Sequence, residues 1–205
     1  MTIIIIIVTS FISFLAFNNK DLFSKLMFNP YQVTHQNEYY RLLTHGFIHA
    51  DWVHLGVNML VLYSFGTMVE YNFKLLEQHG YMHYANIWFV FFYLTAIIIS
   101  SLTTLIKHQD HEYYNSVGAS GAVSAVLFCS IFFAPLSRIS LYAILPIPGI
   151  IFGPIYLIYC QYMSKRNVDN INHEAHLIGA IFGFLFPLLI RFDLINLFTS
   201  QLFNW

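Results

Sequence analysis

The chain has 205 residues, of which 58% are hydrophobic and only 9% are charged, and its formal net charge is −1 with histidine neutral. Soluble domains carry about 25% charged residues, so this composition cannot cover a water-exposed surface and indicates a membrane protein. The near-neutral charge excludes the strongly basic surface that nucleic-acid binding requires, and we expect no nucleic-acid partner.

Six apolar stretches approach the length of about 20 residues that a membrane-spanning helix needs. They cover residues 2–17, 49–69, 84–106, 118–135, 140–162 and 173–191. Pro146, Pro148 and Pro154 interrupt the fifth stretch and predict a kink or a partly re-entrant segment there. We therefore predict an all-α bundle of six transmembrane helices, with residues 1–205 in a single membrane domain.

The connection between the first two helices, residues 18–48, mixes aromatic residues with asparagine, glutamine and histidine. Aromatic rings with polar ends favour the headgroup zone, so a long structured loop in the membrane interface is predicted. An even number of helices places both termini on one side. The Lys and Arg residues near the helix ends number three on that side and six on the other. The positive-inside rule would make the second side cytoplasmic, but the long loop weakens this count and leaves orientation open.

Polar residues within the apolar helices are functional candidates, because an ionisable group at mid-membrane costs about 2.5–3.5 kcal/mol on insertion scales. In the second helix, His54 and Asn58 are four residues apart and share one face. His49 lies well away from that face and need not share their role. The alternative explanation for the pair is hydrogen bonding between helices.

A second cluster, Gly118-Ala119-Ser120-Gly121, begins the fourth helix. The glycines allow the backbone to bend and another chain to approach closely. A serine at a helix N-terminus lies among N–H groups without intrahelical partners, which could hold a developing oxyanion. The alternative is a serine that only caps the helix.

The third cluster lies in the sixth helix, where Gly179 and Gly183 fall on the same side as His176. Small residues at this spacing permit close helix packing, so a base on this helix could reach a nucleophile on another. A histidine bonded to a neighbouring helix is the alternative. Together the clusters supply the minimal serine–histidine pair for acyl transfer, with Asn58 and His54 as donors to an oxyanion.

These motifs resemble those of the rhomboid family of intramembrane serine proteases, over essentially the whole chain. The pattern H-x4-H-x3-N appears as His49, His54 and Asn58, G-x-S-G as residues 118–121, and A-H-x-x-G-x-x-x-G as residues 175–183. The six-helix, rhomboid-like order with a long loop after the first helix agrees with this plan.

The resemblance implies a catalytic dyad of Ser120 and His176 without a third acid. It also implies an oxyanion hole of His54, Asn58 and the Ser120 backbone N–H, and a supporting, non-catalytic His49. By the same resemblance, the protein is an endopeptidase without a cofactor or metal that cleaves transmembrane protein substrates within or near their spans. For localisation, we expect a multi-pass protein of the lipid bilayer in the plasma (inner) membrane of a bacterium.

Further supporting positions also follow from the resemblance: Gly118 and Gly121 beside the serine, Arg41 and Glu70. Arg41 follows Tyr40 and resembles the family's Trp-Arg loop motif with tyrosine substituted. Gly66 and Glu70 resemble the glycine and glutamate that end the second helix.

The chain departs from the family at Ser124. Some members carry an aromatic residue there, four positions after the serine, stacked beneath the catalytic histidine. Either the packing beneath His176 comes from another part of the chain, or the imidazole is held less firmly.

Three other functions are less well supported. The first is a metal-dependent intramembrane protease. The zinc motif H-E-x-x-H is approached by residues 173–176, His-Glu-Ala-His, but this segment is one residue short and shows no third ligand. Cys129 and Cys160 match no metal spacing and are expected to be buried thiols. A non-catalytic rhomboid-like binding protein usually lacks the serine or histidine, and a channel or transporter predicts repeats or charges along one path, which are not visible.

Overall fold

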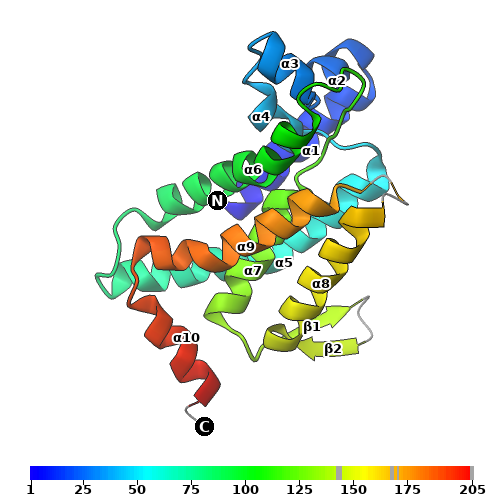
Figure 1. The fold of residues 1–205 in the computed structure, drawn as a ribbon. Coiled ribbons are helices and arrows are strands. Elements are labelled where there is room, and N and C mark those ends of the chain that lie inside the picture. The colour runs from blue at the N-terminus through cyan, green and yellow to red at the C-terminus, as the bar shows by residue number, and fades with distance from the viewer. Residues whose placement is uncertain (142–144, 167–168, 170, 204–205) are drawn as a thin grey trace.

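The computed structural model describes residues 1–141, 145–166, 169 and 171–203. The long helices are α1 (Thr2–Phe17), α5 (Trp52–Gln78), α6 (Ala85–His108), α7 (Ser120–Phe133), α8 (Gly149–Arg166) and α9 (His173–Ile190). The shorter elements are α2 (Lys20–Leu26), α3 (Pro30–His35), α4 (Arg41–Thr44), the 3-10 helix η1 (His45–Phe47), the strands β1 (Arg138–Leu141) and β2 (Leu145–Pro148), and α10 (Leu194–Phe203). Figure 1 shows their arrangement.

The protein is an integral multi-pass, all-α membrane bundle, as predicted. The helices α5, α6 and α9 are long and apolar enough to cross a membrane, and α1, α7 and α10 are shorter apolar helices. Large apolar side chains face outward along these helices: Ile7 is 62% exposed, Val53 75% and Leu189 70%. Such a surface is stable against lipid rather than water, because burial against acyl chains replaces burial in a core.

Helix α7 forms the centre of the bundle. Each of its residues from Gly121 to Phe133 is buried, and α5, α6 and α9 pack around it. In Figure 1, α7 lies among α5, α9 and α8. An apolar helix without a polar face is the expected sequence for this central position.

The closest helix contact joins α7 to α9. A Cβ atom added at Gly179 would collide with the Gly121 carbonyl oxygen, and one added at Gly183 would collide with the Ala125 carbonyl oxygen. The two backbones are therefore in direct contact, which only small residues allow. This contact joins the helix that begins at Ser120 to the helix that carries His176.

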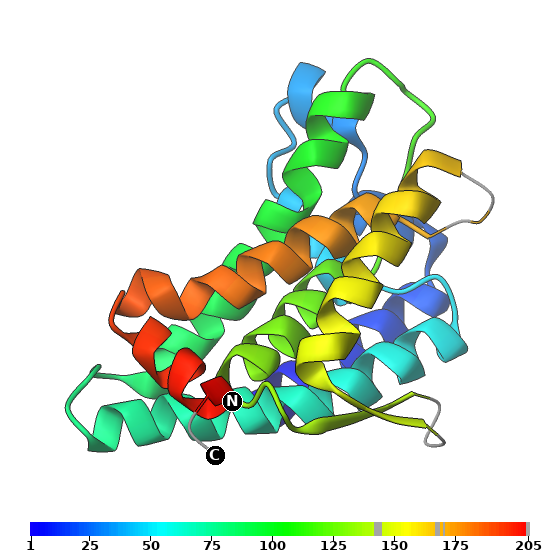
Figure 2. The ribbon, with the colours of Figure 1, turned by 60° about the horizontal axis from the view of Figure 1, so that its bottom comes forward.

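The prediction of a fifth helix over 140–162 is wrong at its start. Strands β1 and β2 pair antiparallel, with Arg138 opposite Pro148, and α8 begins only at Gly149. Pro146 and Pro148 lack the N–H that a helix interior needs. They are tolerated in β2, which is an edge strand of a two-stranded sheet. Residues 142–144 of the predicted helix lie outside the described residues. Figure 2 shows the hairpin leading into α8, which runs alongside α9.

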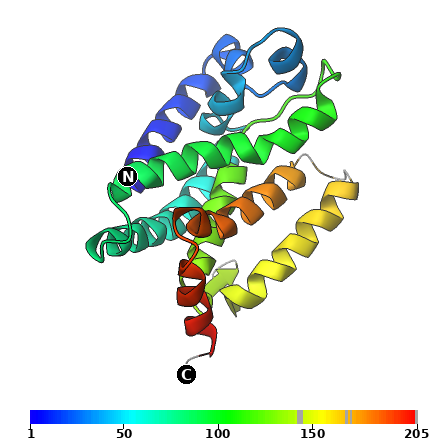
Figure 3. The same ribbon diagram turned by 60° about the vertical axis from the view of Figure 1, so that its left-hand side comes forward.

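Other boundaries also differ from the prediction. The second spanning helix begins at Trp52 because the Asp51 side chain caps it, accepting from the His54 backbone N–H at 2.8 Å. It continues to Gln78, well beyond the predicted end. The predicted interfacial loop contains α2, α3, α4 and η1, which Figure 3 shows grouped near the ends of α1 and α6.

Replacing Gly179 with alanine should destabilise the protein by about 1–3 kcal/mol, because the added methyl group must displace a backbone carbonyl of α7. The matched control is Gly56→Ala in α5, where an added Cβ meets no atom within 4 Å. Alanine is the better helix former by about 1 kcal/mol, so the control should be neutral or stabilising. Reversible unfolding in detergent measures both, and equal stability of the two variants would contradict the close α7–α9 contact.

Candidate active site

Ser120 is the first residue of α7 and follows a tightly held turn. Gly118 has a φ of +119°, a conformation that favours glycine, and its N–H donates to the His45 carbonyl oxygen at 3.0 Å. A Cβ at Gly118 would lie 2.6 Å from Cε1 of His54. Glycine is therefore required at position 118 for two reasons. The positive φ disfavours a side chain, and the His54 ring occupies the space that a Cβ atom would fill. Ser120 itself is half-buried at the N-terminus of α7, where backbone N–H groups lack helical partners.

His49 lies behind this turn and is fully buried. Its Nε2 accepts from the Ala119 N–H at 3.4 Å, and its Nδ1 lies 3.0 Å from the Ser13 hydroxyl oxygen. That hydroxyl donates its single hydrogen to the Phe47 carbonyl oxygen at 3.0 Å. The bonds to Ala119 and Ser13 both fit a neutral imidazole that is protonated on Nδ1 and donates a hydrogen bond from Nδ1–H to the Ser13 oxygen. His49 thus links α1 to the residue before Ser120, an arrangement suited to support rather than chemistry.

His54 and Asn58 project from the first turns of α5. Asn58 is buried, and one of its amide hydrogens donates to the His54 carbonyl oxygen at 2.8 Å, which leaves its second N–H for another acceptor. The Ala50 N–H points at Nδ1 of His54 at 3.5 Å. A neutral ring that accepts at Nδ1 carries its proton on Nε2, and Nε2 would lie 2.9 Å from a Cβ at Gly118. His54 therefore offers a donor beside the Ser120 turn, and Asn58 offers a free amide N–H one helical turn further along α5.

His176 lies in the first turn of α9, and the α7–α9 contact brings this turn to Ser120. A Cβ at Gly121 would lie 3.4 Å from the Ala175 carbonyl oxygen. Within the described ranges, no hydrogen bond joins the Ser120 hydroxyl to the His176 ring. Catalytic hydrogen bonds are often long in the absence of substrate and shorten when it binds. Glu174 pairs instead with Lys107 at 3.4 Å, away from this imidazole.

The surroundings of His176 differ from the family pattern at Ser124. The Ser124 hydroxyl bonds the Tyr156 hydroxyl of α8 at 2.8 Å. The His173 ring lies 5.9 Å from the His176 ring at 72°, and the Cys160 sulfur is also close to it. One side chain of α8, Cys160, and one of α9, His173, therefore lie close to the imidazole. The sequence did not indicate that Cys160 lies near His176, because this proximity depends on how α8 and α9 pack.

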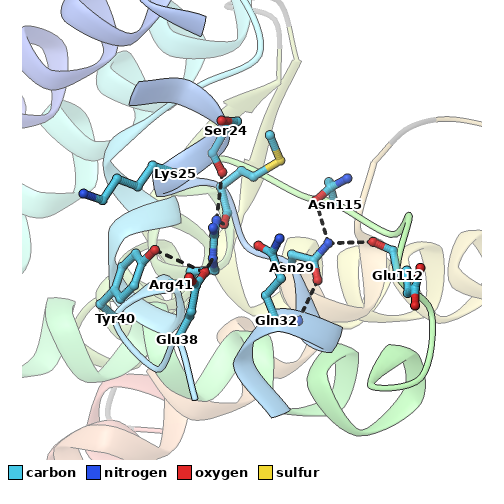
Figure 4. A pocket seen from close by; sticks show the side chains of 10 residues that line it. Ser24, Lys25, Asn29, Gln32, Glu38, Tyr40, Arg41, Glu112 and Asn115 are labelled. Carbon is cyan, nitrogen blue, oxygen red and sulfur yellow. Dashed lines mark hydrogen bonds and ion pairs between the residues drawn. The ribbon is translucent and has the colours of Figure 1, made fainter. Parts of the chain in front are cut away.

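Arg41 organises the loop that precedes the second spanning helix. Its buried guanidinium donates to the carbonyl oxygens of Ser24 and Met27 at 2.8 and 2.7 Å and pairs with Glu38. Figure 4 shows this group in the wall of a cavity of about 510 Å³. Hydrogen bonding to Arg41 lowers the pKa of Glu38. The pair therefore stabilises the fold at neutral pH, and this contribution is lost as the pH falls through the lowered pKa.

The same loop is joined to the turn before Ser120. Phe28 and Ser116 exchange two backbone hydrogen bonds of 3.0 Å each. Beside them, the Asn29 amide donates to the Glu112 carbonyl oxygen at 2.8 Å and to the Asn115 side chain at 3.1 Å. The loop that Arg41 holds is therefore hydrogen-bonded to the segment that precedes Ser120.

Glu70 lies in the second half of α5, and its carboxylate binds the first residue of α1. Its carboxylate accepts from the Thr2 backbone N–H and from the Thr2 hydroxyl, both at 2.9 Å. A Cβ at Gly66 would lie 2.9 Å from the Thr2 methyl group. Gly66 and Glu70 therefore hold the start of α1 against α5. They do not end the helix, which continues to Gln78.

Comparison with known families agrees with this arrangement, since residues 36–192 match the Rhomboid domain. The chain belongs to the rhomboid family. The matched segment includes the Ser120 turn, His54, Asn58 and His176. Rhomboid proteins as a family include intramembrane proteases, and the membrane bundle described above fits that membership.

Individual rhomboid relatives are similar at moderate identity. RHOMBOID-like protein 12, mitochondrial, of Arabidopsis thaliana is 28% identical over 176 residues, covering 76% of this chain and 49% of that protein. Rhomboid protease GluP of Bacillus subtilis is 31% identical over 148 residues (72% and 26%), and Rhomboid protein 1, mitochondrial, of Saccharomyces cerevisiae is 32% identical over 149 residues (68% and 38%).

The alignments span half or less of the length of these three relatives. Two of them are named as mitochondrial and one comes from a bacterium. The location of this rhomboid protein in a bacterial plasma membrane therefore stays a prediction.

Substituting Arg41 with alanine should loosen residues 18–48, because the Ser24 and Met27 carbonyls lose their donor. The expected cost is on the order of 2 kcal/mol, with faster cleavage of this loop in limited proteolysis. Lys25→Ala is the control, since Lys25 is an exposed cation that lines the same cavity. If Arg41→Ala and Lys25→Ala were cleaved at the same rate as wild type, Arg41 would have no organising role.

Proposed function

We propose that this rhomboid protein is an intramembrane serine endopeptidase in which Ser120 is the nucleophile and His176 the general base. The observation that carries the proposal is the backbone contact of α7 with α9. Gly121 touches Gly179. Ser120 directly precedes Gly121, and His176 lies three residues before Gly179, so both lie at the same end of the contact. A serine at a helix N-terminus and an imidazole on an adjacent helix are the components of a catalytic dyad.

The reaction would follow the usual course of serine hydrolases. Ser120 Oγ attacks the scissile carbonyl carbon while His176 takes the hydroxyl proton, and His176 then gives that proton to the leaving amine. Water hydrolyses the resulting acyl-enzyme by the same proton transfers in reverse. The proposed pair would work without a third acid.

The oxyanion of the tetrahedral intermediate would be held by three donors. They are the Nε2–H of His54, the free amide N–H of Asn58 and the backbone N–H of Ser120. Donors fixed in advance in a water-poor site stabilise the developing charge without reorganisation. His54 and Asn58 are fixed by the start of α5, and His49 and Gly118 hold the turn that presents Ser120.

The substrates would be transmembrane segments of other membrane proteins. The outer surfaces of the helices are apolar and suit partners that lie in lipid, and family membership supports proteolysis in the bilayer. The Ser120 turn lies beside the loop of residues 18–48 rather than at the middle of a spanning helix, which would allow water to reach the acyl-enzyme.

Ser120→Ala should abolish cleavage of a helical membrane substrate by the purified protein in detergent, because the variant lacks the attacking oxygen. The control is Ser130→Ala, which removes another α7 hydroxyl, one that donates to the Leu127 carbonyl oxygen. Gel analysis of the substrate measures both variants. Cleavage at the wild-type rate by Ser120→Ala would refute the assignment of the nucleophile.

Asn58→Ala should lower kcat by roughly 10²–10³-fold with a smaller effect on KM, because it removes a donor needed mainly in the transition state. Asn72→Ala is a matched control in the same helix: Asn72 also donates to the carbonyl four residues earlier, at 2.9 Å. An unchanged kcat for Asn58→Ala, or an equal loss for Asn72→Ala, would remove Asn58 from the oxyanion hole.

A further inference from the structure

Two helices bring together three side chains that are typical metal ligands. Cys160 of α8 and His173 and His176 of α9 each offer one ligand atom, and these atoms lie within 4.8 Å of one another. Cys160 is fully buried and His173 is 4% exposed. Cys160, His173 and His176 are called the CHH cluster below. Figure 2 shows α8 running beside α9.

The hydrogen bonding of His173 is a second observation, independent of the distances in the CHH cluster. Its Nδ1 is buried and finds no hydrogen-bond partner among the residues that the structure describes. Its Nε2 lies 3.1 Å from both carboxylate oxygens of Asp169. Leaving a buried polar atom without a partner costs about 1–3 kcal/mol, so an orphaned ring nitrogen calls for an explanation.

The Asp169 contact fixes the tautomer of a neutral His173 ring. A carboxylate accepts a hydrogen bond from Nε2–H, and a neutral ring then presents a lone pair on Nδ1. A histidine with a carboxylate on one nitrogen and a free lone pair on the other is the usual arrangement around a bound metal ion. The Asp169 side chain is 33% exposed, so it also marks the end of the CHH cluster that is open to solvent.

The donor set selects the ion. Thiolate and imidazole together favour zinc, which takes four ligands in a tetrahedron and often leaves one of them to water. We propose that the CHH cluster binds Zn²⁺ through the Cys160 sulfur and one ring nitrogen each of His173 and His176, with water as the fourth ligand. The thiol proton is released to solvent when the ion binds.

The ion would regulate the enzyme rather than take part in the reaction. A ring nitrogen of His176 that is bound to zinc cannot accept the Ser120 proton, and the cation would also disfavour protonation of this imidazole. Zinc would therefore inhibit proteolysis, and this consequence rests on the proposed function. The binding of the ion does not, because it depends only on the three ligands and Asp169.

The binding test uses the full chain in detergent with Co²⁺ as a spectroscopic substitute for zinc. Wild type should show a near-ultraviolet thiolate-to-cobalt charge-transfer band that added Zn²⁺ removes. Cys160→Ser and, as a second variant, His173→Asn should lose the band. Cys129→Ser, which changes the other buried cysteine, should keep it. Absence of the band in wild type, or its persistence in Cys160→Ser, would overturn the proposal.

Two further measurements separate this site from the proposed activity. Ser120→Ala should bind Co²⁺ with the wild-type spectrum, so the metal site is decided even if no substrate is cleaved. In the cleavage assay, micromolar Zn²⁺ should reduce the wild-type rate at least tenfold. The rate of Cys160→Ser, compared with its own metal-free rate, should fall much less. Equal inhibition of Cys160→Ser and wild type would overturn the regulatory role of the CHH cluster.

Discussion

The direct contact between the backbones of α7 and α9 is the constraint on which the rest of the site depends. It exists because Gly121, Gly179 and Gly183 carry no side chain where the two helices meet. In lipid, water does not drive helices together, so close van der Waals packing must supply the association. The same contact sets the relative position of Ser120 and His176, which lie at one end of it. Packing and the proposed chemistry therefore share one structural cause.

A second set of interactions fixes the nucleophile from the opposite side. His49 bonds the Ala119 N–H, and Gly118 bonds the carbonyl oxygen of His45. The loop of residues 18–48, held by Arg41, pairs with Ser116 immediately before this turn. A low-dielectric environment makes each unsatisfied polar atom costly, so these bonds hold the turn in one conformation. Such rigidity is what fixed oxyanion donors require.

Sequence alone predicted the all-α membrane bundle, because apolar length is a local property. The family resemblance pointed to His49, His54 and Gly118, which the structure places at the Ser120 turn. Sequence alone failed at the start of α8, where prolines in a long apolar stretch form a hairpin instead of a kinked helix. The short helices of residues 18–48 were missed, although Asn29 followed by Pro30 is a helix-start signal. The proximity of Cys160 to His173 and His176 could not be predicted, since it depends on how α8 packs against α9.

The most direct test of the central claim is the reaction of the native protein with a fluorophosphonate, mapped by mass spectrometry. The Ser120–His176 pair predicts a single phosphonylated serine, Ser120, and a labelling rate at least roughly 100-fold lower in His176→Ala, since general-base assistance is lost. Thermal unfolding of His176→Ala controls for damage to the fold. Labelling of Ser120 at the same rate in wild type and His176→Ala, or labelling of another serine, would contradict the pairing.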